Sequence, residues 1–122
     1  MLIVVSRYEK GGVTIMIVLL NNDTVKKGIN EHQTKITEWK GRPAVSLQVV
    51  AVLKKKHGFV SVWNTLFFLD TCTYRDYQTI LWNGPEDKVL VNSVKPIEYC
   101  LEKSVETEFD KQVLDYCLKQ KS

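Results

Sequence analysis

The sequence predicts an α+β fold, a mostly antiparallel β-sheet with one C-terminal α-helix packed on it. Runs rich in β-branched and aromatic residues fill most of the chain, and clusters of Asn, Gly and Lys separate them. After Ser104 the spacing of apolar residues changes from the period of a strand to that of a helix. The length of 122 residues suits a single domain, residues 1–122, with one core.

The strands follow from these runs in chain order. Residues 13–20, 44–53 and 58–68 have the length and composition of buried strands. Residues 33–39 alternate more weakly, which predicts an edge strand that ends before a turn at residues 41–43.

The last third of the chain predicts a hairpin and then the helix. Residues 88–92 and 96–101 alternate like two strands joined across residues 93–95. Ser104 is expected to cap the helix through its hydroxyl group. The helix should cover the sheet with one apolar stripe: Phe109, Val113, Tyr116 and Cys117.

Composition excludes several classes of protein. Hydrophobic residues make up 44% and charged residues 25% of the chain, which is typical of a folded globular protein. The longest apolar run, residues 15–20, is too short to cross a membrane, and the first residues do not resemble a signal peptide. The three cysteines, Cys72, Cys100 and Cys117, lack the spacing of a metal or redox motif. We therefore expect a cytoplasmic protein with reduced cysteines, no membrane contact, no metal and no cofactor.

Catalytic chemistry is not expected. Only His32 and His57 offer an imidazole base, and neither lies in a known catalytic spacing. No glycine-rich phosphate loop is present, and the acidic residues of the middle of the chain are dispersed as in solvated loops: Asp70, Asp76, Glu86 and Asp87.

Basic residues are the strongest binding signal. Lys54, Lys55 and Lys56 lie in one predicted turn, residues 26–27 in another, and Arg42 and Arg75 in loops, on a chain of net charge +3. Two interpretations stay open: a basic edge that binds DNA, or lysines that keep strand edges soluble. Three phosphate contacts give a salt slope of roughly −2.7, about a fortyfold loss of affinity between 50 and 200 mM salt. DNA binding would thus call for self-association on DNA or tandem copies.

Aromatic residues offer a second route to nucleic acid. Their rings could stack on exposed bases, but no aromatic ladder recurs at a fixed spacing, so we favour packing inside the fold. The residues concerned are Trp39, Trp63, Trp82, Tyr74 and Tyr77.

Several segments resemble the ComK competence transcription factors. Residues 66–73 (LFFLDTCT) are similar to the family's Phe-Phe-Pro-Thr-x-Ser strand end, and residues 80–83 to its following Trp strand. Gly41-Arg42 lies upstream at a similar spacing, and residues 109–113 (FDKQV) resemble the family's Phe-Glu-Asn-Gln-Val helix start. The family's proline is replaced by Leu69-Asp70, and the chain is shorter than typical members.

This resemblance implies a transcriptional activator of competence genes that binds double-stranded, AT-rich promoter DNA and whose level is set by an adaptor and a Clp protease. Minor-groove readers rely on Lys, Arg, Asn and Gln and on groove width, which this composition permits. The predicted DNA contacts are Lys54, Lys55, Lys56, Arg42 and Arg75. The alternative is a small protein-binding module, such as a phage-type inhibitor that docks a strand edge on its partner.

Overall fold

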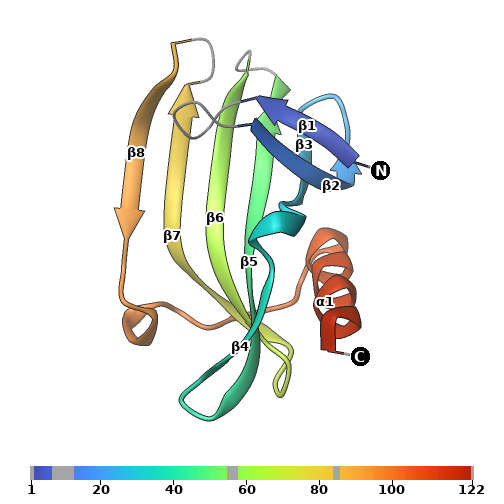
Figure 1. Ribbon diagram of the computed structural model, residues 1–122, viewed down its shortest axis with the longest axis vertical. Coiled ribbons are helices and arrows are strands. Elements are labelled where there is room, and N and C mark those ends of the chain that lie inside the picture. The colour runs from blue at the N-terminus through green and yellow to red at the C-terminus, as the bar shows by residue number, and fades with distance from the viewer. Residues whose placement is uncertain (1, 7–12, 55–57, 84–85, 122) are drawn as a thin grey trace.

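The structure, a computed structural model, describes residues 2–6, 13–54, 58–83 and 86–121. Its strands form one antiparallel sheet in the order β1-β2-β3-β5-β6-β7-β8, with β4 paired to β5 and β9 to β7 (Figure 1). The strands are β1 (Leu2–Ser6), β2 (Val13–Asn21), β3 (Val25–Ile29), β4 (Lys35–Trp39), β5 (Arg42–Leu53), β6 (Phe59–Phe68), β7 (Thr73–Asn83), β8 (Lys88–Val94) and β9 (Lys103–Ser104). The helices are the 3-10 turns η1 (Glu31–Gln33) and η3 (Ile97–Tyr99), and α1 (Glu108–Lys121). The predicted α+β class is confirmed.

The centre of the sheet is built by β5, β6 and β7. The first two of these coincide with the predicted strands 44–53 and 58–68, as β2 does with 13–20. Both β3 and β4 pair with β5, on either side of η1: Ile29 lies opposite Val49, and Lys35 opposite Ser46. The predicted weak strand at 33–39 is therefore β4, which continues the line of β3 along β5.

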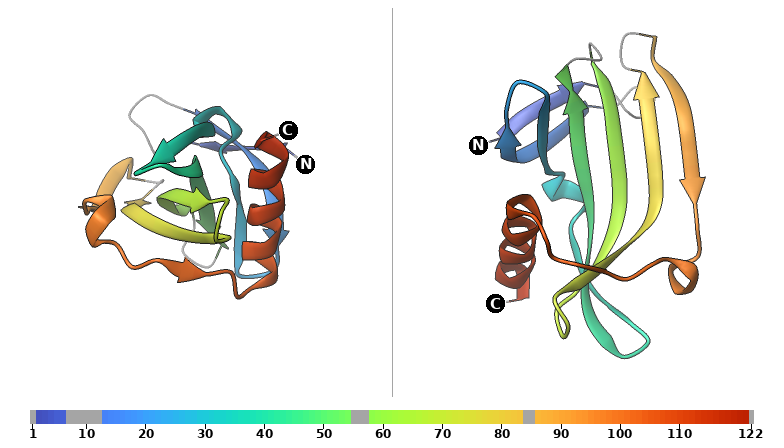
Figure 2. Two further views of the ribbon diagram at one scale, coloured as in Figure 1. Left: turned by 90° about the horizontal axis from the view of Figure 1, so that it is seen from below. Right: turned by 180° about the vertical axis from the view of Figure 1, so that it is seen from behind.

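The helix covers one face of this sheet, as Figure 2 shows. Val113 and Cys117 are buried against Val45, Leu47 and Phe67, with the predicted stripe partners Phe109 and Tyr116 packed at the border. Burial raises the pKa of the Cys117 thiol to about 12, so this thiol stays protonated at neutral pH. The predicted stripe is thus confirmed, and in the described part of the chain no helix has the length and apolarity to cross a membrane.

The start of the helix lies one turn later than expected. Thr107, and not Ser104, provides the cap: its Oγ1 accepts the backbone N–H of Asp110 at 3.1 Å. In return, Asp110 Oδ2 accepts the backbone N–H groups of Glu106 and Thr107 at 3.3 and 3.4 Å. This reciprocal capping box satisfies the backbone N–H groups of Glu106, Thr107 and Asp110, and it leaves Ser104 free to pair with Thr73 in the sheet.

Three further predictions about turns are wrong. The hairpin between residues 88–92 and 96–101 does not form, because β8 pairs with β7 and the chain then turns through η3. The turn before β5 consists of Lys40 and Gly41, with φ of 49° and 79°, whereas Arg42 is already opposite Trp39 in the ladder. Two successive positive φ angles are typical of a type I′ hairpin turn, which favours a glycine.

Residues 26–27 lie in β3 and not in a turn, next to the bulge of β2 between Val18 and Leu20. Gly28 makes this strand pairing possible, since a Cβ atom there would clash with the carbonyl oxygen of Ile17. The sequence pattern hid β3 because two lysines interrupt its apolar residues.

Candidate functional site

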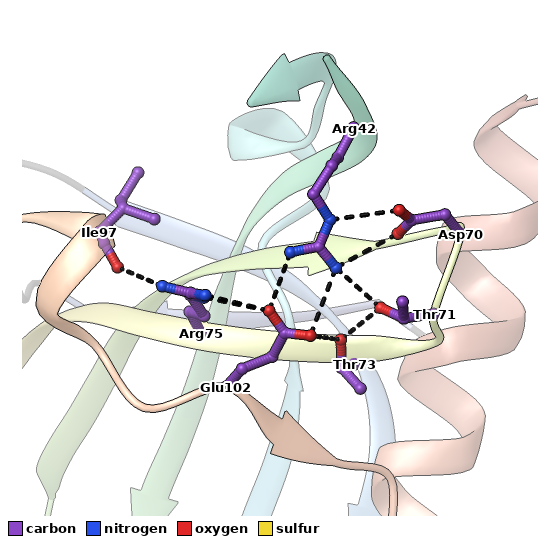
Figure 3. A network of polar contacts seen from close by, with 7 residues as sticks. All are labelled: Arg42, Asp70, Thr71, Thr73, Arg75, Ile97 and Glu102. Carbon is purple, nitrogen blue, oxygen red and sulfur yellow. Dashed lines mark hydrogen bonds and ion pairs between the residues drawn. The ribbon is translucent and has the colours of Figure 1, made fainter. Parts of the chain in front are cut away.

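The two predicted arginine contacts meet in a network of polar side chains, drawn in Figure 3. Arg42 begins β5 and Arg75 lies in β7, and both guanidinium groups bind the carboxylate of Glu102, just before β9. Arg42 Nη1 lies 2.9 Å and Arg75 Nη2 3.2 Å from Glu102 Oε1. Arg42 Nε also binds Asp70 Oδ2 at 3.2 Å, in the turn between β6 and β7.

We call Arg42, Asp70, Arg75 and Glu102 the arginine cluster. Two aromatic rings lie next to its guanidinium groups. The Arg42 guanidinium stacks 3.9 Å from the centre of the Phe68 ring, and that of Arg75 lies 4.9 Å from Trp39.

Other donors and acceptors close the network. Arg75 Nη1 donates to the carbonyl oxygen of Ile97 at 3.0 Å, and Thr73 donates to Glu102 at 2.7 Å. Two carboxylates balance the two guanidinium groups, and the bonds connect the segment after η3 to β5 and to the β6–β7 hairpin.

The electrostatic consequence appears at Glu102. Hydrogen bonds from Arg42, then Thr73 and Arg75, lower the pKa of this carboxyl group from 4.5 to about 2, against the opposing effect of partial burial. Hydrogen bonds to Glu102, and then to Asp70, raise the pKa of Arg42. Arg42 and Glu102 therefore stay ionised at neutral pH, and both guanidinium groups of the cluster are engaged by protein carboxylates.

The predicted lysines lie elsewhere. Lys54 follows β5 directly, and its backbone N–H donates to the carbonyl oxygen of Thr24 at 3.0 Å. Its Nζ donates to Asn21 Oδ1 at 2.6 Å. The pairing of Lys26 with Val52 places a second lysine at this end of the sheet. We call Lys26 and Lys54 the lysine end; Lys55, Lys56 and His57 lie outside the described residues.

The charge of the lysine end is not balanced in the way that the arginine cluster is. Among the described residues, neither Lys26 nor Lys54 forms an ion pair with a carboxylate. Both side chains lie at least partly in solvent. This end of the sheet therefore has cationic groups available for an anionic partner.

The predicted site residues that the structure describes, Arg42, Lys54 and Arg75, are thus divided into two groups. Arg42 begins β5 and Lys54 directly follows its 12 residues, so they lie about 40 Å apart along an extended strand, at roughly 3.3 Å per residue. Figure 2 shows the β4–β5 turn and the far end of β5 at opposite ends of the molecule. A single basic edge that includes both Arg42 and Lys54 does not exist in this arrangement.

A cavity of about 230 Å³ lies between α1 and the sheet. Its apolar wall includes Trp63 and Phe109, and Lys27 Nζ lies 4.7 Å from the centre of the Phe109 ring. Asp76, expected in a solvated loop, lines this cavity from β7, where it accepts from Thr65 at 2.6 Å and pairs with Lys103 at 3.2 Å. The carboxylate of Asp76 and the ammonium group of Lys103 thus bind one another.

Tyr74 also lines this cavity. Burial raises the pKa of the nearby Tyr74 hydroxyl to about 12, so it stays protonated. His32 is exposed in η1 and does not line the cavity, and His57 lies outside the described residues. Over the described ranges, no group of three or more His, Cys, Asp or Glu side chains is arranged to hold a metal ion.

The aromatic residues pack as the sequence favours. Trp82 is buried and donates its indole N–H to Asp87 at 3.3 Å. The ring of Trp39 lies 5.7 Å from that of Phe68, and Tyr74 stacks on Phe67 at 5.4 Å. Trp39, Tyr74 and Trp82 therefore pack against other residues of the fold.

Comparisons with known proteins give no relative. No family model matches the chain, and no curated protein or solved structure matches it with significance. The geometry of the chain itself must therefore carry the functional argument.

Proposed function

We propose that the protein is a DNA-binding transcriptional regulator, as its resemblance to the ComK family implies, and that it contacts the phosphate backbone through its lysine end. One observation carries this proposal. The pairing of β3 with β5 brings Lys26 and Lys54, from two separate lysine runs, to the same end of the sheet, without a described carboxylate partner. Lys55 and Lys56 follow Lys54 directly in the chain.

The proposal does not include Arg42 and Arg75 among the DNA contacts, although the sequence analysis predicted them as contacts. The guanidinium donors of Arg42 and Arg75 bind Glu102, and those of Arg42 also bind Asp70. A phosphate would have to replace carboxylates that are already in place. Lysine ammonium groups in solvent release counterions on contact with phosphates, which is the main source of sequence-independent affinity for DNA.

The expected affinity is modest. Contacts by Lys54, Lys55 and Lys56 give a salt slope of roughly −2.7, and Lys26 adds about −0.9. Such a patch cannot hold one copy tightly at physiological salt, so we expect more than one copy to bind along a promoter.

The test is an electrophoretic mobility shift on AT-rich and GC-rich duplexes of equal length, over a series from 50 to 200 mM salt. We expect tighter binding to the AT-rich duplex and a salt slope between about −3 and −4. Replacing Lys54, Lys55 and Lys56 by Ala should reduce the slope by about 2.7. The control is Lys111→Ala, at an exposed position of α1, which should leave it unchanged.

Two results would contradict the proposal: absence of binding to either duplex, and binding that does not depend on salt. Such results would favour the second candidate, a protein-binding module. That candidate is supported by a separate observation, the exposed edge strand β8.

A further inference from the structure

The strand β8 forms one edge of the sheet, opposite the side that carries α1 in Figure 1. All of its residues are exposed, including four large apolar ones: Val89 (49%), Leu90 (42%), Val91 (46%) and Val94 (67%). In the described part of the chain, no strand pairs with its outer side. Apolar side chains gathered on an unpaired edge are a template for another strand.

The backbone of β8 is oriented for such pairing. The N–H of Lys95 donates to the carbonyl oxygen of Tyr77 at 2.9 Å, so Lys95 and Tyr77 form a hydrogen-bonded pair. Because such pairs alternate in an antiparallel ladder, the backbone groups of Val94 and Asn92 point away from β7. The register is regular from Val91 to Val94, beyond the bulge between Leu81 and Trp82.

A row of side-chain amides crosses the sheet and ends at this edge. Each amide nitrogen donates to the oxygen of the next side chain, from Asn30 in the core to Asn92 on β8. The bonds run from Asn30 to Gln48 (3.0 Å), to Asn64 (3.1 Å), to Gln78 (2.8 Å) and to Asn92 (3.0 Å).

The direction of this amide row follows from its first member. Asn30 Oδ1 accepts the backbone N–H of His32 at 3.1 Å, as the cap of η1. A backbone N–H can only donate, so the oxygen of Asn30 must face His32 and its NH₂ group must face Gln48. Each following amide is then fixed in turn, and Asn92 ends the row with its NH₂ group. Asn92 is only the acceptor in its bond with Gln78, and its NH₂ group donates to no atom of the described residues.

We propose that β8 docks an extended segment of a partner protein, which places a side-chain oxygen opposite Asn92 and carries acidic residues at its ends. Such a segment would pair with the free backbone groups, cover the exposed valines and continue the amide row by one bond. The acidic ends would face Lys88 and Lys95, which bracket the strand and form no ion pair with a described carboxylate.

A second copy of this chain fits the edge less well. If two β8 strands paired with Asn92 opposite Asn92, two donor groups would meet at the ends of the two amide rows. The same register would bring Lys88 of one copy close to Lys95 of the other, where like charges repel. The edge therefore favours a partner strand that has a hydrogen-bond acceptor opposite Asn92 and negatively charged residues at its ends. A second β8 strand does not offer these groups.

The test uses two fluorescent peptides as long as the 7 residues of β8. One has the sequence Glu-Val-Thr-Asn-Thr-Val-Glu, and the other has Leu in place of Asn. Fluorescence anisotropy should show that the Asn peptide binds about fivefold more tightly, the effect of one net hydrogen bond.

Variants of the protein locate the effect. Asn92→Leu should remove the preference for the Asn peptide, while Ser93→Ala, at the adjacent position of β8, should keep it. Asn92 is exposed, and circular dichroism will verify that both variants are folded.

Four outcomes would overturn the inference. These are binding of neither peptide, equal affinity for both, a preference that persists in Asn92→Leu, and a wild-type dimer in sedimentation equilibrium that Asn92→Leu dissociates. The last outcome would identify a second copy as the occupant. The inference does not depend on DNA binding, because the peptides should bind equally well to the variant that lacks Lys54, Lys55 and Lys56.

Discussion

The arginine cluster and the lysine end place the same kind of charge in opposite settings, at the two ends of β5. Arg42 is partly buried on the Phe68 ring and is bound by two carboxylates. Lys54 bonds to a neutral amide, with no described ion pair. A guanidinium group taken partly out of water needs counter-charges in a fixed geometry, whereas a lysine ammonium group stays hydrated. Basic residues near one another in a sequence can thus build the fold or bind a partner, and the surrounding acids distinguish the two roles.

The largest expected effect is the loss of the central carboxylate of the arginine cluster. Glu102→Leu leaves two partly buried guanidinium groups without their shared acceptor, and should lower the free energy of unfolding by about 2–3 kcal/mol. Urea denaturation measures this change.

The matched control is Glu98→Leu. This carboxylate pairs with Lys40 at 3.6 Å, but both side chains are more than half exposed, at 52% and 61%. Its loss should cost less than about 1 kcal/mol. Equal effects of the two substitutions would contradict a structural role for the arginine cluster.

The next effect concerns the shape of the Arg42 side chain. Arg42→Lys keeps the charge but cannot reach Asp70 and Glu102 together with several donors, so it should cost about 1–2 kcal/mol. Thermal unfolding followed by circular dichroism measures the loss. If this variant is as stable as the wild type, a positive charge alone is enough to stabilise the cluster, and the planar guanidinium group is not required.

Acid should weaken the arginine cluster in a defined range of pH. The pKa of Glu102 is lowered from 4.5 to about 2, so its contribution to stability is complete above pH 4.5 and is lost as the pH falls toward 2. The pKa of Asp70 is shifted in the same direction by Arg42. Urea denaturation between pH 6 and 2 should show a smaller loss of stability in Glu102→Gln than in the wild type; parallel curves would contradict this.

The smallest effect on stability is expected at the lysine end. The double variant Lys26→Ala and Lys54→Ala removes exposed or half-exposed ammonium groups without a described ion pair, so the free energy of unfolding should change by less than about 0.5 kcal/mol. A loss comparable with that of Glu102→Leu would show that both basic regions hold the fold together.

The sequence predicted the class of the fold and its central strands because these depend on local patterns. Residues 44–53 and 58–68 are rich in β-branched, aromatic and other apolar residues, and the stripe of Val113 and Cys117 has a clear helical period. The hairpin after residue 88 was wrong because partner choice is not local. The alternation of β8 suits pairing with β7 as well as with the next segment, and tertiary packing decides between them.

The candidate sites were predicted only in part. Arg42 and Arg75 were identified as basic, but their acidic partner Glu102 lies 60 positions from Arg42 in the chain, and no local pattern connects the two. Asn92 was missed for the same reason, since its amide row crosses four sheet strands. One local signal did exist: Gln48 and Asn64 lie at the middle of two predicted strands, where an apolar core residue is usual.

The central claim is that the lysine end binds DNA and the arginine cluster does not. The most direct test compares how substitutions in these two basic regions change the salt dependence of DNA affinity. The measurement is fluorescence anisotropy with an AT-rich duplex, for the wild type, the Lys26 and Lys54 double variant, and Arg42→Gln. We predict that the lysine variant lowers the salt slope by about 1.8, for two lost phosphate contacts, and that folded Arg42→Gln leaves the slope unchanged. A lower slope in Arg42→Gln, with an unchanged slope in the lysine variant, would contradict the account.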